Sequence, residues 1–144
     1  YNLALLLENG LGVPTDMPKA AFWYQQASDR GNINAQYALG MMYEAGRGVS
    51  QSHEKAASLY LAAAENGHIE SQVNLGVVFV KGASSVQNYI QAHMWFNIAA
   101  SQGNSAARDY RDHIAKQMVP QDISTAQQLA QSCVLQNYIG CSPL

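Results

Sequence analysis

Residues 31–67 read Gly-Asn-Ile-Asn-Ala-Gln-Tyr-Ala-Leu-Gly-Met-Met-Tyr-Glu-Ala-Gly-Arg-Gly-Val-Ser-Gln-Ser-His-Glu-Lys-Ala-Ala-Ser-Leu-Tyr-Leu-Ala-Ala-Ala-Glu-Asn-Gly, and this stretch decides the fold. Shifting it by 36 positions in either direction brings similar residues into register. The recurring landmarks are Gly31, Gly67 and Gly103; Trp23, Leu59 and Trp95; Tyr24, Tyr60 and Phe96; and Ala27, Ala63 and Ala99. Self-similarity at a period of about 20–50 residues is typical of stacked units that cannot bury their apolar faces alone. The chain is therefore predicted to be a repeat protein.

Each repeat is predicted to contain two helices, over residues 35–45 and 53–66 in the intact copy. Both segments carry apolar residues at helical spacing. In the first these are Ala35, Leu39, Met42 and Tyr43, and in the second Ala56, Leu59, Tyr60 and Ala63. Because both helices are short, packing must stabilise them.

The signals for helix starts and ends recur with the repeat. Side chains that can cap a first turn precede each second helix, at Asp16, Ser52 and Asn88. Glycines suited to a left-handed conformation follow it, at Gly31, Gly67 and Gly103. Asn32 and Asn104 are predicted to cap first helices, and His68 interrupts that series.

The motif Ala-x3-Leu-Gly-x2-Tyr-x2-Gly-x-Gly-Val, followed by Lys-Ala-x2-Trp/Leu-Tyr-x2-Ala and a closing glycine, resembles the Sel1-like repeat, a bacterial-type relative of the tetratricopeptide repeat. The resemblance covers about residues 1–104. It implies an all-α fold: a right-handed α/α solenoid of two-helix repeats with a C-terminal capping helix pair. The sequence departs from the pattern at Gln91, at Ser84 in a less regular third loop, and at Ala4.

We expect four segments: repeats at about 1–34, 35–70 and 71–104, and capping helices with a tail at 105–144. The first repeat lacks counterparts of residues 31–36, so we expect a piece of a longer protein with further repeats upstream. Pro120 is predicted to end one capping helix, and Asp122 or Ser124 to cap the next, over residues 123–133.

Composition excludes some kinds of partner. The chain has 144 residues, 48% of them hydrophobic and 12% charged, with a formal net charge of −2. It has no basic stripe for nucleic acid or for anionic lipid. No apolar run approaches the roughly 18 residues of a transmembrane helix. Nucleic acid and anionic lipid are therefore not expected as partners.

The two cysteines, Cys133 and Cys141, lie eight positions apart near the C-terminus. We favour a disulfide that fastens the tail to the capping helix. A disulfide predicts a periplasmic or secreted protein, whereas reduced thiols would leave the cytoplasm as the alternative. Two thiolates without a nearby histidine make an incomplete zinc site, so no metal is predicted.

The sequence offers no catalytic constellation and no cofactor motif. Histidines 53, 68, 93 and 113 share no metal-binding spacing and are predicted to lie at the surface or at helix ends. No Ser-x-x-Lys or Gly-x-Ser-x-Gly motif is present. Glu8 and Glu44 are read as a solvated face, and Trp23 and Trp95 as core residues.

The first helices of such solenoids line a concave side. Residues predicted to face that side are Tyr1, Leu5, Glu8, Tyr37, Met41, Glu44, Val73, Val77 and Val80. Most are apolar, and exposed apolar patches tend to mark interaction sites. The alternative is that this face packs against a neighbouring helix or against N-terminal residues that precede Tyr1.

The leading functional prediction is a non-enzymatic scaffold or adaptor that presents this face to a peptide or protein. Two alternatives stay open. By resemblance, cysteine-rich relatives suggest β-lactam binding or hydrolysis, and the incomplete first repeat suggests a self-assembling structural module.

Overall fold

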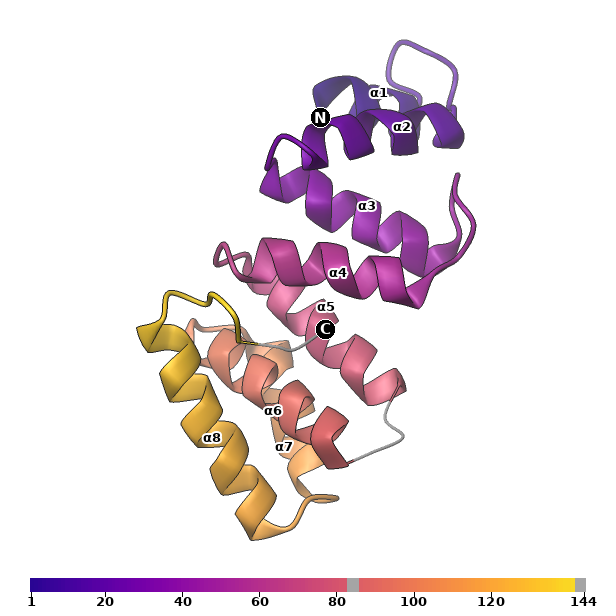
Figure 1. The fold of residues 1–144 in the computed structure, drawn as a ribbon. Helices are drawn as coiled ribbons and strands as arrows, with labels where there is room; N and C mark the ends of the chain where they lie inside the picture. Colours follow the sequence, from indigo (N-terminus) through magenta and orange to yellow (C-terminus); the bar gives the residue numbers. More distant parts are fainter. Residues whose placement is uncertain (83–85, 142–144) are drawn as a thin grey trace. The chain divides into compact units, whose positions relative to one another are not determined.

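The computed structural model describes residues 1–82 and 86–141, and within these ranges the chain forms eight helices and no strands (Figure 1). Their bounds are α1 Asn2–Asn9, α2 Met17–Ser28, α3 Ile33–Ala45, α4 His53–Ala64, α5 Ile69–Lys81, α6 Val86–Ser101, α7 Ser105–Ala115 and α8 Pro120–Leu135. The all-α repeat architecture predicted from the period is confirmed. The connection over 83–85, predicted to be less regular, lies outside the described residues.

The chain divides into two compact units, Tyr1–Ala63 and Ala64–Leu144. In unit 1, α2 packs against both α1 and α3. The core lies between these helices and is built from small residues around a few large ones, namely Ala4, Ala20, Ala21, Tyr24, Ala35, Leu39 and Met42. The Tyr60 side chain of α4 lies over Gly40 of α3, which brings α4 into the same unit.

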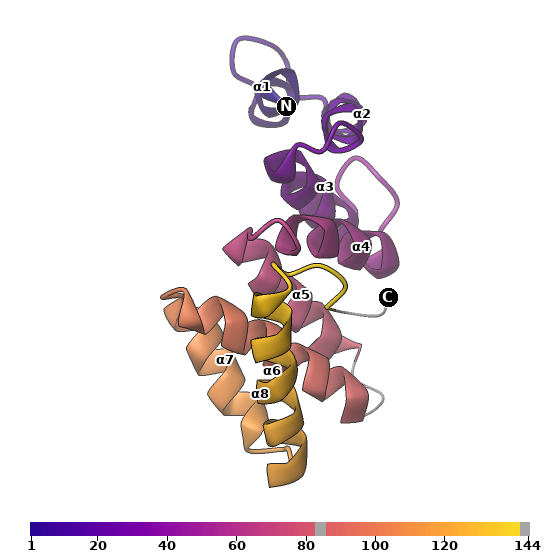
Figure 2. The same ribbon diagram turned by 60° about the vertical axis from the view of Figure 1, so that its left-hand side comes forward.

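In unit 2, α6 is central: it packs against α5, α7 and α8 (Figure 2). One side of α6 shares a core with α5 and α7, made of Val73, Ala92, Phe96, Ala99, Ala107 and Ile114. The other side of α6 is left for α8. This arrangement differs from unit 1, where the described helices supply no counterpart of α8.

Most of these helices have a side-chain N-cap, and most of the caps are at positions that the sequence predicted. Asp16, Asn32 and Asn104 each accept the backbone N–H three residues later, at 2.8–3.0 Å, and Ser52 accepts that of Lys55 at 3.3 Å. The bond from the Lys19 N–H lowers the pKa of the Asp16 carboxyl. His68 continues the series instead of interrupting it, because its Nδ1 accepts the Ser71 N–H at 3.2 Å.

Two kinds of glycine shape the repeats. Gly31, Gly67 and Gly103 follow the second helices with φ of 80°, 80° and 94°, the left-handed conformation that the sequence predicted. Gly40 and Gly76 instead permit close helix packing. A Cβ atom would lie 2.6 Å from the Tyr60 ring at Gly40 and 2.5 Å from the Phe96 ring at Gly76.

Two predicted helix starts were wrong. Asn88 lies inside α6, which begins two residues earlier, and its side-chain amide donates to the Gly82 carbonyl at 2.8 Å. Pro120 begins α8 instead of ending the preceding helix, and neither Asp122 nor Ser124 caps it. A proline in the first helical turn forgoes only an N–H that would lack a helical partner anyway, so Pro120 favours a start there.

The prediction that Trp23 belongs to the core was wrong. Trp95 is fully buried as predicted, but Trp23, at the equivalent repeat position, is 40% exposed. The difference extends over a whole stripe of α6, which we call the α8 face: Ile90, Gln91, Met94, Trp95 and Ile98, all buried. Both α5 and α7 pack on the other side of α6, and Ile98 of this stripe lines a hollow together with Ala130 and Val134 of α8. We therefore assign the cover of this stripe to α8, which packs against α6.

Candidate functional site

The predicted concave face of unit 1 is built from two copies of one arrangement. The Tyr24 hydroxyl donates to Glu8 at 2.6 Å, and the Tyr60 hydroxyl donates to Glu44 at 2.9 Å. The Tyr1 and Tyr37 rings lie 5.9 and 6.1 Å from those of Tyr24 and Tyr60. Leu5 and Met41 are half-buried beside them.

The reading of Glu8 and Glu44 as a solvated face was wrong. Both are half-buried, and each accepts a hydrogen bond from a fully buried tyrosine. Glu8 also pairs with Arg47 at 3.2 Å. Burial, followed by the Glu8 carboxylate, raises the pKa of the Tyr24 phenol far above its usual value of 10.0, so the phenol remains a neutral donor at physiological pH. These carboxylates therefore serve the packing of their repeats.

In unit 2 the corresponding positions are apolar and open into a pocket. Val73 is buried in the core, so the predicted exposure does not hold there. Val77 and Val80 are half-buried and line a pocket of about 220 Å³ between α5 and α7. We call this the α5–α7 pocket, and its lining is Val77, Val80, Lys81, Phe96, Tyr110, His113 and Ile114.

The pocket arises from a coupled change within the repeat. Glu8 and Tyr24 of the first repeat, like Glu44 and Tyr60 of the second, correspond to Val80 and Phe96 in the third. Both partners of the partly buried hydrogen bond are thus replaced by apolar side chains, which leaves no polar group unsatisfied. Sequence reasoning missed the walls contributed by Phe96 and α7, although this paired substitution was a visible signal.

The chemistry of the pocket suits an apolar side chain. Phe96 is 1% exposed at its base, and the Tyr110 ring stacks against Phe96 with centroids 5.4 Å apart. Lys81 and His113, both exposed, bring a positive charge and an imidazole to the lining. Small-molecule pockets are usually about 300–1,000 Å³, so this smaller one fits part of a larger partner better than a whole ligand.

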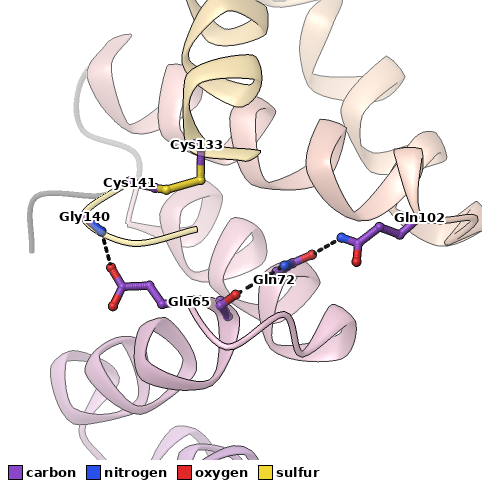
Figure 3. The surroundings of a disulfide bond; sticks show 7 residues. Glu65, Gln72, Gln102, Cys133, Gly140 and Cys141 are labelled. Atoms are coloured by element: carbon purple, nitrogen blue, oxygen red, sulfur yellow. Dashed lines mark hydrogen bonds between the residues drawn. A yellow bond between two sulfur atoms is a disulfide. The ribbon is translucent and has the colours of Figure 1, made fainter. Parts of the chain in front are cut away.

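Cys133 and Cys141 form a disulfide bond, with Sγ atoms 2.09 Å apart (Figure 3). The bond closes a loop that folds back onto the connection between α4 and α5. There the Gly140 N–H donates to the Glu65 carboxylate at 2.8 Å. Nearby, the Gln102 side-chain amide donates to the side-chain oxygen Oε1 of Gln72 at 2.8 Å, which satisfies a fully buried polar group. The predicted disulfide therefore fastens the tail within unit 2.

The histidine prediction holds at three positions and fails at one. His53 begins α4, His68 caps α5 and His113 is exposed, whereas His93 is only 2% exposed. Its Nδ1 has no hydrogen-bond partner. Burial, and then the charge of Arg111, lower the pKa of His93, while Asp112 opposes them. Arg111 itself is held by Asn97 and Asp112, which explains an arginine where earlier repeats have leucine.

Lowering the pH from 7.5 to 5 is expected to destabilise the folded chain through His93. Because its charged form is disfavoured in the fold, the unfolded chain binds more protons below its ordinary pKa of 6.5, and stability falls with falling pH. His93→Ala, which installs the residue found at positions 21 and 57, should flatten this dependence. Urea denaturation at several pH values measures the slope.

His113→Ala, which removes an exposed histidine of α7, is the matched control for the loss of one imidazole. An unchanged slope in His93→Ala would contradict the assignment. The cavity that alanine leaves at position 93 lowers stability at every pH, so the comparison rests on slopes and not on absolute values.

Among the described residues, no group of three or more His, Cys, Asp or Glu side chains is placed to hold a metal ion. None of the helices that the structure describes has the length and apolar character needed to cross a membrane.

Comparisons with known proteins agree with this fold. A protective antigen present in uropathogenic Escherichia coli strains, displaying an SLR fold, matches at 26% identity and a TM-score of 0.84, over 97% of this chain and 30% of that one. A Sel1 repeat protein from Oxalobacter formigenes matches at 25% identity and a TM-score of 0.74, over 96% of this chain and 64% of that one. This chain thus spans less than two thirds of either. No curated protein sequence matches it.

The family model of the Sel1 repeat matches residues 1–32, 33–68 and 69–104. Repeats of this kind generally serve as scaffolds for protein–protein interaction. Since the three matches cover well over half of the sequence, the chain belongs to the Sel1 repeat family.

Proposed function

We propose that this chain is a non-enzymatic adaptor that binds a protein or peptide segment by taking one apolar side chain into the α5–α7 pocket. The observation that carries the proposal is the replacement of a partly buried Glu–Tyr pair by Val80 and Phe96. A third repeat with the usual pair would fill this position with polar groups. The apolar version instead leaves a hollow of about 220 Å³.

The lining also suggests what flanks the bound side chain. Lys81 and His113 favour a segment with acidic residues, or a terminal carboxylate, beside the apolar anchor. Tyr110 is 47% exposed and offers an amphipathic surface of the kind enriched at interaction sites. Tyr37 and Met41, both half-buried, are proposed as a separate contact surface on unit 1.

The disulfide is the basis for proposing that the protein functions in an oxidising compartment, such as the bacterial periplasm or the cell exterior. Its loop is anchored to Glu65, so an oxidised tail is part of the packed unit. The alternative location is the cytoplasm, where the same cysteines would be reduced.

Val80→Glu with Phe96→Tyr tests the proposal by restoring the pair found in the first two repeats. Phe96→Tyr alone should lower the free energy of unfolding by about 1–3 kcal/mol, because it buries a hydroxyl without an acceptor. Adding Val80→Glu should recover most of that loss and fill the pocket. Peptides selected by phage display on the parent should carry an apolar residue beside acidic ones, and should lose affinity for the double variant.

Equal binding of the selected peptides to parent and double variant would overturn the pocket assignment. The β-lactamase alternative has its own measurement, the turnover of a penicillin-type substrate. We expect the parent to show no turnover above the rate in buffer. Turnover that survives purification would instead favour an enzyme.

A further inference from the structure

A second surface, on α2 of unit 1, has the composition of a docking site. Phe22 is 55% exposed and Trp23 is 40% exposed, and their rings contact edge to face with centroids 5.2 Å apart. Pro18 and Lys19 lie on the same stripe and are also exposed. Two adjacent aromatic side chains of this size carry a large apolar area for a helix that faces solvent.

The chain contains its own reference for what covers such a stripe. Pro18, Lys19, Phe22, Trp23 and Gln26 are the repeat equivalents of Ile90, Gln91, Met94, Trp95 and Ile98, the α8 face of α6. That face is buried, and α8 packs against α6. The tryptophan position is the same, and Phe22 matches Met94 in apolar character. On α4 the equivalents Glu54, Lys55 and Ser58 are polar, so the match is not general to all repeats.

The buried residues of α8 indicate which side chains can pack against such a stripe. They are small and recur at helical spacing: Ala126, Ala130 and Cys133, with exposures of 0%, 4% and 2%. Small side chains let a helix approach closely while a large ring such as Trp95 fills the space between turns. A helix facing Trp23 therefore needs small residues at positions i, i+4 and i+7.

We propose that the Phe22–Trp23 face of α2 docks a helix of a partner protein, one that carries an α8-like stripe of small apolar residues. The charge of the face refines this partner. Lys19 stands where the α8 face has the buried, uncharged Gln91, and in the free protein it pairs with Asp16 at 3.1 Å. A docked helix covering Lys19 must therefore place an acidic or amide side chain opposite it.

The test uses the whole chain and a synthetic peptide of residues 119–136 with Cys133→Ser. The chain contains only two tryptophans, so fluorotryptophan labelling gives one resonance for Trp23 and one for Trp95. We expect the peptide to shift the Trp23 resonance saturably and to leave that of the buried Trp95 in place. A dye-labelled peptide measured by anisotropy gives the affinity.

Phe22→Ser with Trp23→Leu is the matched variant, because it gives α2 the residues of Ser58 and Leu59 on α4. The affinity of this variant for the peptide should be about tenfold lower or more, as expected when two aromatic anchors are lost. The Val80→Glu, Phe96→Tyr variant should bind the peptide as the parent does, so failure here is separable from failure of the proposed pocket.

Three outcomes would overturn the proposal. The first is the absence of a saturable Trp23 shift up to the solubility limit of the peptide. The second is a shift of Trp95, which would mean that the peptide displaces α8 within unit 2. The third is a Trp23 shift that depends on protein concentration without peptide, which would assign the face to a second copy of this chain.

Discussion

Replacing Trp95 with alanine is expected to lower the free energy of unfolding by about 3–5 kcal/mol, the usual cost of truncating a buried large aromatic residue. The side chain is fully buried on the α8 face of α6, where small residues of α8 leave no other large group to fill the space. Globular domains are stable by only about 5–15 kcal/mol, so the loss would be severe. Urea denaturation followed by far-UV circular dichroism measures it.

The control lies at the equivalent position of the first repeat. Trp23→Ala removes the same side chain from a site that is 40% exposed and should cost about 1 kcal/mol or less. Equal losses at the two positions would contradict the assignment of α8 as the cover of Trp95. Comparing Trp95→Ala with Trp23→Ala thereby separates the effect of burial under α8 from the effect of the residue type.

Opening the disulfide is expected to lower the free energy of unfolding by about 2.5 kcal/mol, from the closure entropy of so short a loop. The cysteines are separated by 8 positions, and the closed loop also presents the Gly140 N–H to Glu65. Cys141→Ser is the informative variant, because it leaves Cys133 as a buried thiol that behaves as a small apolar group. Thermal and urea denaturation both report the change.

Reduction supplies the control for this variant. Dithiothreitol should destabilise the parent by a similar amount and leave Cys141→Ser unaffected. Parent protein that unfolds identically with and without reductant would contradict a stabilising disulfide. Alkylation of free thiols in intact source cells, before lysis, shows whether the bond forms in the native compartment and so tests the proposed localisation.

Much of the fold could be predicted because the same structural signals occur in three successive repeats. The period, the caps at Asp16, Asn32 and Asn104, and the glycines with positive φ are all local signals that recur. What could not be predicted locally is which stripe receives an additional helix. Trp23 and Trp95 read alike in the sequence, and only the packing of α8 on α6 distinguishes them. The stripe did carry a hint, since Gln91 replaces the lysine of both earlier repeats.

The candidate site was predicted less completely than the fold. Val77 and Val80, predicted to face a partner, line the α5–α7 pocket, and their binding role stays a prediction. Val73 is buried in the core, and the α7 wall was missed. Helical spacing places a residue on a side of its own helix and cannot show how deeply the next helix covers it. The prediction that His93 lies at the surface or at a helix end was wrong for the same reason. Its repeat equivalents are buried alanines, and the spacing of the histidines alone does not show this.

The exchange of a Glu–Tyr pair for Val80 and Phe96 also bears on how such repeats diverge. Either substitution alone leaves a buried tyrosine hydroxyl without its acceptor or a half-buried carboxylate without its donor, so the intermediate sequences are less stable than both ends of the path. Among related sequences, positions 8 and 24, 44 and 60, and 80 and 96 should therefore change in pairs. A repeat that has crossed this barrier is slow to return, which would preserve an apolar hollow in one member of the array while its neighbours stay filled.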